Sequence, residues 1–384
     1  MSMMLPSSRR GSKRRAAALL VTFGLLLAAC GPGGRTLRTS PSAAQPSQLV
    51  DPAKIISGGP PPDGIPPIDH PKFLSASKVD FLSPREPVIA IDVGGDARAY
   101  PVQILIWHEI VNDTVGGVPL TVTYCPLCNT GIAFRRPTAG GRLLDFGTSG
   151  KLYNSNLLMY DRETKSLWAQ ALGEAVVGPL SGMKLELVPA QMVAWGDWLL
   201  ANPHGKVLSR DTGAGRPYGR NPYAGYDAPG SRPFLFTGTL DPRLPATARV
   251  VGVQVGPDIE ALPYDSLSSQ RVGGWAVVQT VVGGRNMAVF WKAGTLSALD
   301  SSIIADSRDV GSTGVFDREL SGRLLSFHAA PLGIVDDQTG SRWDIFGRAV
   351  AGPLAGQSLD RVISIESFWF DWAAFHPDTK IYGR

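Results

Sequence analysis

The sequence is poor in the residues that staple small domains and hold metals. Its 384 residues include only three cysteines and five histidines, and Cys30 stands far from the other two cysteines. One pair of cysteines cannot staple a chain of this length, so we expect the fold to depend on its hydrophobic core. After residue 29, no segment has the ~20 uninterrupted apolar residues that a membrane-spanning helix needs.

The first 29 residues have the order of a secretory signal peptide. Basic residues at 9–15 precede a short apolar run that ends in Leu27-Ala28-Ala29-Cys30. A cysteine directly after small residues is typical of a bacterial lipobox, although an ordinary signal peptide or membrane anchor with a chance cysteine is the alternative. We expect 1–29 to be removed and the lipid-modified Cys30 to hold the protein on a membrane. The Pro-, Ser- and Gly-rich segment 30–57 is then a flexible tether.

The charge balance has no basic excess once the signal peptide is set aside. The chain has 37 basic and 33 acidic residues, and five of the basic ones leave with the signal, so the remainder has 32 basic residues. No basic run is left to bind nucleic acid, which excludes that class of partner. We expect a protein of the cell envelope, either facing the periplasm or on the outer surface. The sequence leaves room for a protein partner but identifies none.

Two parts of the chain repeat one another in order and spacing. The pattern Asp-x-x-Thr-x-Ser-x-Trp begins at Asp161 and again at Asp336, and Gly-Pro-Leu follows it at 178–180 and at 352–354. Trp-x-Asp-Trp then occurs at 195–198 and at 369–372. The repeat predicts an internal duplication that gives two pseudo-symmetric lobes, the first at 58–235 and the second at 236–384.

Each repeat has the composition of short strands joined by tight turns. Runs such as "NLLMYD" are bounded by Asp, Gly and Thr, which favours hairpins. One short helix is expected in each repeat, at 191–202 and at 366–376, ended by Pro203 and Pro377. Since so few helices cannot cover both faces of a parallel sheet, we expect a β-rich α+β fold. In the Asp-x-x-Thr-x-Ser-x-Trp pattern, we expect Asp and Thr to cap a turn and Trp to fill the core.

The pair Cys125-Pro126-Leu127-Cys128 is the most specific chemical feature of the sequence. The second repeat has "SRDVGSTG" in its place, so the thiols belong to the first lobe alone. Two thiols at this spacing can hold a soft metal ion, form a redox-active disulfide, or act only as a staple. "NTG" follows Cys128, which predicts a turn and a new strand rather than the helix of thioredoxin-like sites.

A metal at the thiol pair would need further ligands, because the chain has no second cysteine pair. His108 is the best candidate, and Met159 could add a thioether, although a histidine or methionine in such a setting is more often structural. Two thiolates and an imidazole would suit copper or zinc. A nucleophilic role for Ser149, in the polar segment 145–162, has no Ser-centred motif behind it, and a loop that satisfies its own backbone is the better interpretation.

Several long segments are similar to a known family. "ARAYPVQILIWHEIVND", "VTYCPLCNTGIAF", "SGKLYNSNLLMYDRETKSLW" and "FWFDWAAFHPDT" occur in the order of the prokaryotic domain-of-unknown-function family numbered 3179. The resemblance covers roughly residues 56–384 and implies an exported or membrane-associated protein, with no established reaction. It also implies that the first cysteine is the more regular one and that the second can be replaced by Thr.

The sequence therefore supports three hypotheses. The first is an exported lipoprotein whose first lobe holds copper or zinc through Cys125, Cys128 and His108. The second is a thiol-disulfide oxidoreductase that uses Cys125 and Cys128. The third is a non-catalytic binding or assembly module at the cell envelope. Since the resemblance implies that the second cysteine can be replaced, it favours a metal-binding or single-thiol role for Cys125 over a disulfide with Cys128.

Overall fold

The computed structural model describes residues 48–384. Cys30 and the predicted signal peptide lie outside these residues, as does most of the predicted tether. The last part of that tether belongs to the folded body, because β1 (Ile55–Ser57) pairs antiparallel with β10 (Phe146–Tyr153). Across residues 48–384, the helices are all too short or too polar to cross a membrane.

A first series of elements runs from residue 87 to residue 208 and consists mainly of strands. Before it come a 3₁₀ turn, η1 (Pro52–Lys54), and β1, followed by β2 (Phe73–Ser75) and η2 (Ala76–Lys78). The series itself comprises β3 (Pro87–Val93), β4 (Asp96–Pro101), α1 (Val102–Leu105), β5 (Ile110–Val115), β6 (Val118–Cys125), β7 (Thr130–Arg135), β8 (Thr138–Ala139), β9 (Arg142–Leu143), β10, β11 (Asn156–Asp161), β12 (Leu167–Ala169), β13 (Glu174–Val177), β14 (Leu187–Val188), β15 (Gln191–Ala194), α2 (Trp195–Ala201) and β16 (Lys206–Leu208).

A second series begins at residue 249, after a long segment without strands. It comprises β17 (Arg249–Val255), β18 (Asp258–Pro263), α3 (Tyr264–Ser268), β19 (Trp275–Val282), β20 (Arg285–Lys292), η3 (Ile304–Asp306), β21 (Ser312–Asp317), β22 (Glu319–Leu320), β23 (Arg323–Leu324), β24 (Phe327–Ala330), β25 (Gly333–Asp336), β26 (Arg342–Trp343), β27 (Ala349–Ala351), β28 (Ser364–Phe368), α4 (Trp369–Phe375) and β29 (Lys380–Ile381). Strands and short helices alternate as in the first series, and the predicted β-rich character is confirmed.

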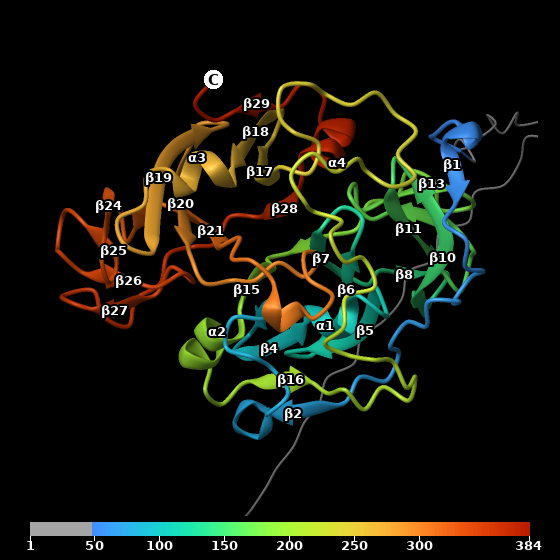
Figure 1. Cartoon of the computed structure of the whole chain (residues 1–384), viewed down its shortest axis with the longest axis horizontal. Helices are drawn as coiled ribbons and strands as arrows, with labels where there is room; N and C mark the ends of the chain where they lie inside the picture. Colours follow the sequence, from blue (N-terminus) through green and yellow to red (C-terminus); the bar gives the residue numbers. More distant parts are fainter. Residues whose placement is uncertain (1–47) are drawn as a thin grey trace, which may run out of the picture. The chain divides into compact units, whose positions relative to one another are not determined.

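The sheets of the two series share part of their strand orders. One sheet has the order β15-β3-β4-β16-β2, and another has β28-β17-β18-β29. The strands β7-β6-β5 form a meander, as do β19-β20-β21, which lie side by side in orange in Figure 1. The strands β10 to β13 and β24 to β27 are each paired in sequence order. Moreover, β28 of the second series contacts β7 of the first, and β15 of the first series contacts β21 of the second.

The repeated Asp-x-x-Thr-x-Ser-x-Trp pattern has the structural role predicted for it. A carboxylate oxygen of Asp161 accepts hydrogen bonds from the Thr164 hydroxyl at 2.8 Å and from the Trp168 ring N–H at 2.9 Å. Asp336 accepts the corresponding bonds from Thr339 and from Trp343. Both tryptophans are fully buried, so each turn fixes a core side chain.

The two predicted helices are shorter than their sequence pattern indicates. The segment 191–194 forms β15 and only Trp195–Ala201 is helical, while 364–368 forms β28 and Trp369–Phe375 is α4. The prediction was wrong for the first turn, because these residues satisfy their backbone groups by pairing with β3 and β17. Each helix therefore begins directly at the end of a buried strand. This arrangement places Asp371, in the first turn of α4, against the loop that carries the cysteines.

Candidate functional site

The thiol pair lies on the hairpin between β6 and β7. Cys125 is the last residue of β6, and residues 126–129 form the loop before β7. Asn129 donates its backbone N–H to the Pro126 carbonyl at 3.3 Å, and its φ of 52° lies in the left-handed region that Asn tolerates better than most residues. The Tyr124 hydroxyl donates to the Asn129 amide oxygen at 3.2 Å. The prediction of a turn followed by a strand, with no helix, is confirmed.

Both thiols are free and buried, with exposed fractions of 2% for Cys125 and 0% for Cys128. They face the same acceptor: the Ser155 carbonyl lies 4.0 Å from Cys125 Sγ and 3.5 Å from Cys128 Sγ. Ser155 and Asn154 form the tip of the β10–β11 hairpin with φ values of 66° and 51°, a turn in which glycine is usual. The Ser155 hydroxyl donates to the Phe234 carbonyl at 2.6 Å, which holds this tip in place.

A buried carboxyl group stands behind Cys128. The Asn156 side-chain amide donates to Cys128 Sγ at 3.4 Å and to Asp371 Oδ1 at 3.1 Å, so one group bridges the thiol and the carboxyl. The Ser367 hydroxyl donates to Asp371 Oδ2 at 2.8 Å. Burial raises the pKa of Asp371 to about 6, against the opposing effect of hydrogen bonds that include one from Cys128. Burial also raises the pKa of the Cys128 thiol well above its usual range, as does the hydrogen bond with Cys125.

The backbone fixes this carboxyl group to the thiol loop. Phe368, the last residue of β28, donates its N–H to the Cys128 carbonyl at 2.9 Å. The side chains of Phe368 and Phe370 belong to the same hydrophobic core as Cys125 and Cys128. The position of α4 relative to the thiols is therefore set by both hydrogen bonding and packing.

Cys125 lies on the wall of a cavity of about 150 Å³. Most of the other lining side chains are apolar: Ile65, Leu127, Leu152, Leu157, Phe234 and Leu235. The polar lining groups include Glu109 and Tyr223. Burial raises the pKa of Tyr223, and the nearby Glu109 and Cys125 raise it further when they are charged. A thiol, a carboxyl group and a phenol therefore meet in one small, mainly apolar space.

Glu109 is held in a strained backbone conformation. Its φ is 58°, and the Ile110 N–H donates to the His108 carbonyl at 2.6 Å, which defines a γ-turn centred on Glu109. This turn is rare and costs about 1–3 kcal/mol at a residue other than glycine. Tyr124 donates its N–H to the Glu109 carbonyl at 2.8 Å, which places Glu109 across from the end of β6 and hence beside Cys125. Burial raises the pKa of the Glu109 carboxyl to about 8, so it is protonated at neutral pH.

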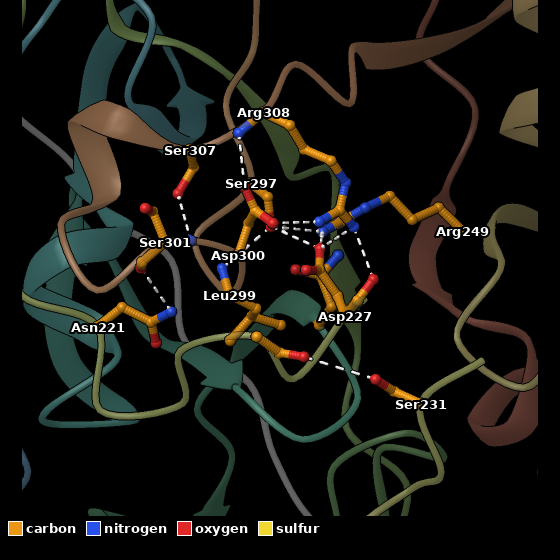
Figure 2. Close-up of polar contacts among 12 residues, drawn as sticks. Asn221, Asp227, Ser231, Arg249, Ser297, Leu299, Asp300, Ser301, Ser307 and Arg308 are labelled. Carbon is orange, nitrogen blue, oxygen red and sulfur yellow. Dashed lines mark hydrogen bonds and ion pairs between the residues drawn. The ribbon is translucent and has the colours of Figure 1, made fainter. Parts of the chain in front are cut away.

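Residues 221–235 cover the site, and a buried ion pair anchors them. Figure 2 shows Asp227 between Arg249, on β17, and Arg308, which follows η3. Asp227 Oδ2 lies 2.6 Å from Arg249 Nη2 and 2.9 Å from Arg308 Nη2, and it accepts a hydrogen bond from the Ser297 hydroxyl at 2.6 Å. Burial opposes ionisation of Asp227, but the two guanidinium groups and Ser297 outweigh it and lower the pKa. The covering segment is thus fastened to the second series of elements.

His108 has a different environment from the one predicted for it. Its Nδ1 lies 2.6 Å from the Pro66 carbonyl, so Nδ1 carries the hydrogen, and its Nε2 lies 2.6 Å from the Tyr218 hydroxyl. Burial lowers the pKa of His108, which favours a neutral ring that accepts from Tyr218. Within residues 48–384, no group of three or more His, Cys, Asp or Glu side chains is placed to hold a metal ion. The predicted trio of Cys125, Cys128 and His108 is therefore not assembled, while Cys125 and Cys128 do lie together.

The other residues considered from the sequence have structural roles. The Ser149 hydroxyl donates to the Leu158 carbonyl at 2.5 Å and accepts from the Lys151 N–H at 3.0 Å, so it satisfies the backbone of its own hairpin, as expected. Met159 is fully buried in the core. Sequence reasoning missed Glu109, Asn156 and Asp371, since a lone carboxyl or amide in a repeated or turn-rich segment carries no motif. The one available signal was that the His-Glu pair occurs in the first repeat alone.

A search of curated proteins and of solved structures found no match. A family model described as a protein of unknown function (DUF3179) matches residues 62–379, which include every residue of the thiol site and its cavity apart from Gly58 and Pro60. The chain therefore belongs to the DUF3179 family.

Proposed function

We propose that Cys125 and Cys128 form a redox-active pair that acts on a small oxidised substrate in the cavity. The observation that carries this proposal is the order of the groups: the cavity, the Cys125 thiol on its wall, the Cys128 thiol that faces the same Ser155 carbonyl, and the Asp371 carboxyl joined to Cys128 through Asn156. Cys125 is the thiol that a substrate meets first. Cys128 is enclosed by protein, which suits a resolving thiol.

Asp371 supplies the proton acceptor that such a pair needs. A thiol attacks as its thiolate, and burial keeps Cys128 protonated at neutral pH. With a pKa of about 6, Asp371 is ionised at pH 7 and can take the Cys128 proton as that sulfur forms its bond to Cys125. The products of the cycle are a two-electron-reduced substrate and a Cys125–Cys128 disulfide. An external dithiol then returns the pair to its reduced form.

We also infer that the two series of elements arose by an internal duplication, as the sequence repeat predicts. In that alignment Asp197 of α2 corresponds to Asp371 of α4. Lys292 ends β20 as Cys125 ends β6, although it lies one position after Trp291, which pairs with Thr313 as Cys125 pairs with Thr130. Asp197 forms an ion pair with Lys292 at 2.7 Å, and it too reaches from one series to the other. The ion pair of Asp197 with Lys292 has a structural role. In the other copy the carboxyl faces thiols, which supports a chemical role for that copy.

A redox titration tests the proposal directly. Tag-free residues 48–384 are equilibrated in buffers with different ratios of reduced to oxidised dithiothreitol for the lower potentials and of reduced to oxidised glutathione for the higher ones. The samples are then quenched in acid, alkylated and analysed by mass spectrometry. We expect one reversible two-electron transition, with a potential in the range of about −120 to −300 mV found for thiol-disulfide proteins. Cys125→Ser and Cys128→Ser each abolish it. A pair that remains as two thiols in the most oxidising buffer would overturn the proposal.

Copper or zinc binding is the competing proposal for the same thiols. Two adjacent sulfur ligands support it, since thiolates select these metals. His108 would have to leave Pro66 and Tyr218 to become a third ligand. Metal analysis of untagged protein, purified without chelators, is the test: this proposal predicts one metal ion per chain in the wild type and none in Cys125→Ser.

For location, we propose an exported protein held at the cell envelope by a lipid on Cys30. The support is the order of the basic residues, the apolar run and the small residues before this cysteine. Mass spectrometry of the N-terminal peptide from the native host is the test. A lipid-modified peptide beginning at Cys30 is expected, and Cys30→Ala should abolish the modification.

A further inference from the structure

The cavity beside Cys125 combines one polar end with apolar walls. Its volume of about 150 Å³ is well below the ~300 Å³ at the lower end of pockets for drug-sized ligands, so it has room for a group of a few heavy atoms. Cys125 is 2% exposed, so a bulky protein disulfide cannot reach its sulfur without displacing the covering residues Tyr223, Phe234 and Leu235. The geometry favours a small molecule, or a single side chain, as the reacting group.

Glu109 is the group that points to a ligand. Glu109 is 8% exposed and lines the cavity, and among residues 48–384 its carboxyl has no hydrogen-bond partner. A buried carboxyl without a partner is destabilising, and so is the γ-turn that holds this residue. Two unfavourable features at one position, directly beside a reactive thiol, are typical of a functional residue.

We propose that this cavity binds a small sulfoxide and that Glu109 is the proton donor to its oxygen. The inference rests on the proposed redox function of Cys125 and Cys128. A sulfoxide is neutral, its oxygen accepts hydrogen bonds strongly, and its two alkyl groups match the apolar walls. A protonated carboxyl donates to that oxygen, and the Tyr223 hydroxyl is a second donor. A disulfide substrate would not need the acid, because its leaving thiolate has a pKa near ~8.5 and departs without protonation.

The first step transfers one oxygen atom from the substrate to Cys125. The Cys125 sulfur forms a bond to the sulfoxide sulfur while Glu109 protonates the oxygen, and the proton of the Cys125 thiol replaces the one that Glu109 gives up. The oxygen then moves to Cys125, which becomes a sulfenic acid, and the thioether leaves. Cys125 is oxidised by two electrons and the sulfoxide is reduced by two.

The second step closes the disulfide. The Cys128 sulfur attacks the sulfenic sulfur of Cys125, Asp371 takes the Cys128 proton, and the hydroxyl group leaves as water with a proton from Glu109. The net result is one S–S bond and one water molecule, with both carboxyl groups returned to their starting states by proton exchange with solvent. An external dithiol reduces the disulfide and restores both thiols.

The test uses free methionine sulfoxide and, as a peptide mimic, N-acetylmethionine sulfoxide amide. Each is incubated with the protein and dithiothreitol, and thioether formation is followed by NMR. We expect turnover of at least one of them by the wild type and none by Cys125→Ser. Glu109→Gln should lower kcat/KM by about 100-fold or more, the usual effect of losing a general acid. Glu319→Gln, which alters an exposed carboxyl on β22, is the matched control and should behave as wild type.

A single-turnover experiment without reductant gives a second readout. The wild type should yield one thioether and one Cys125–Cys128 disulfide per chain, whereas Cys128→Ser should yield one thioether and a sulfenic acid on Cys125 that dimedone traps. Reduction of the free amino-acid derivative supports a small-molecule source, and reduction of the peptide mimic alone supports a protein-bound source. Both support the sulfoxide class.

Two results would overturn the inference. The first is no thioether from either sulfoxide while diamide still converts the pair reversibly to a disulfide, in which case the redox function stands and only the substrate class fails. The second is Glu109→Gln with wild-type kcat/KM, which would remove Glu109 from the chemistry. Failure of diamide to form the disulfide would instead overturn the redox function itself.

Discussion

The Cys128 thiol and the Asp371 carboxyl are neighbours, joined by one amide group. Asn156 Nδ2 lies 3.4 Å from Cys128 Sγ and 3.1 Å from Asp371 Oδ1, although the three residues come from a hairpin loop, a strand and a helix in distant parts of the chain. The bond from Phe368 N–H to the Cys128 carbonyl prevents these elements from separating. The thiol and its proton acceptor are therefore held in place before any substrate arrives.

Asp371→Asn should slow closure of the disulfide. The variant keeps the shape and most hydrogen bonds of the site but removes the proton acceptor, so we expect the rate to fall by about 100-fold at pH 7. In the wild type the rate should rise with pH through a midpoint near 6, because Asp371 must be ionised to act, and this dependence should be absent from the variant. Stopped-flow measurement of tryptophan fluorescence after addition of diamide gives both values. Asp197→Asn, the corresponding change beside Lys292, is the control and should leave rate and midpoint unchanged.

Glu109→Gln should stabilise the protein, and more so at higher pH. The folded-state pKa of Glu109 is raised from 4.5 to about 8, so the folded state binds more protons than the unfolded state between these values, and wild-type stability is lost as pH rises. From pH 5 to pH 8 the free energy of unfolding of Glu109→Gln, relative to wild type, should increase by about 3 kcal/mol. Urea denaturation at several pH values measures it. A variant that loses stability at pH 8 would contradict the raised pKa.

Asp227→Asn should loosen the cover over the thiols. The change removes the negative charge between Arg249 and Arg308, and breaking a buried ion pair on one side costs about 3–5 kcal/mol. We expect iodoacetamide to alkylate Cys125 at least tenfold faster in the variant, as measured by mass spectrometry of the native protein. Because the folded-state pKa of Asp227 is lowered, wild-type stability from this group is present above the unfolded pKa and is lost as pH falls through the folded value.

The control for that experiment is Asp309→Asn, which removes an exposed partner of Arg85 and should not change the alkylation rate. Circular dichroism shows whether Asp227→Asn remains folded. Equal alkylation rates in folded Asp227→Asn and in wild type would mean that the ion pair does not control access to Cys125.

Local turn chemistry could be predicted from the sequence, whereas the direction of single side chains could not. Asn129 after the cysteines predicts a turn because few residues accept its left-handed φ of 52°. Gly131 follows within the strand β7. His108 and Glu109 are adjacent, and the sequence favoured the histidine as the functional residue. The γ-turn at Glu109 turns its side chain into the cavity and leaves His108 bonded to Pro66 and Tyr218. A γ-turn at a glutamate has no sequence signal.

Long-range contacts escaped prediction for a related reason. Asp371 is part of a pattern repeated at Asp197, and a repeated residue is more often structural than chemical. Its proximity to Cys128 arises from the position of β28 beside β7, a contact between distant segments that no local pattern encodes. The helix predicted at 191–202 was too long at its start. Its first residues are apolar at a spacing that suits a buried strand as well as a helix.

Asp161→Asn and Asp336→Asn should destabilise the protein by similar amounts. Each carboxylate accepts hydrogen bonds from the backbone N–H and the hydroxyl of a threonine and from the ring N–H of a buried tryptophan, with matching distances in the two turns. An amide keeps one acceptor oxygen and points a donor at these donors, so we expect about 3 kcal/mol of destabilisation at each position, as for loss of buried charge-assisted bonds.

Urea denaturation at pH 7 measures both variants, and Asp337→Asn, which alters an exposed carboxylate next to Asp336, is the control with an expected change within about 0.5 kcal/mol. Neither Asp161→Asn nor Asp336→Asn should alter the redox potential of Cys125 and Cys128 while the protein is folded, because both turns act through core packing. A large loss of stability at Asp161 with none at Asp336 would show that the two turns, despite similar hydrogen bonding, do not contribute equally, and it would weaken the inference that they are copies of one structural unit.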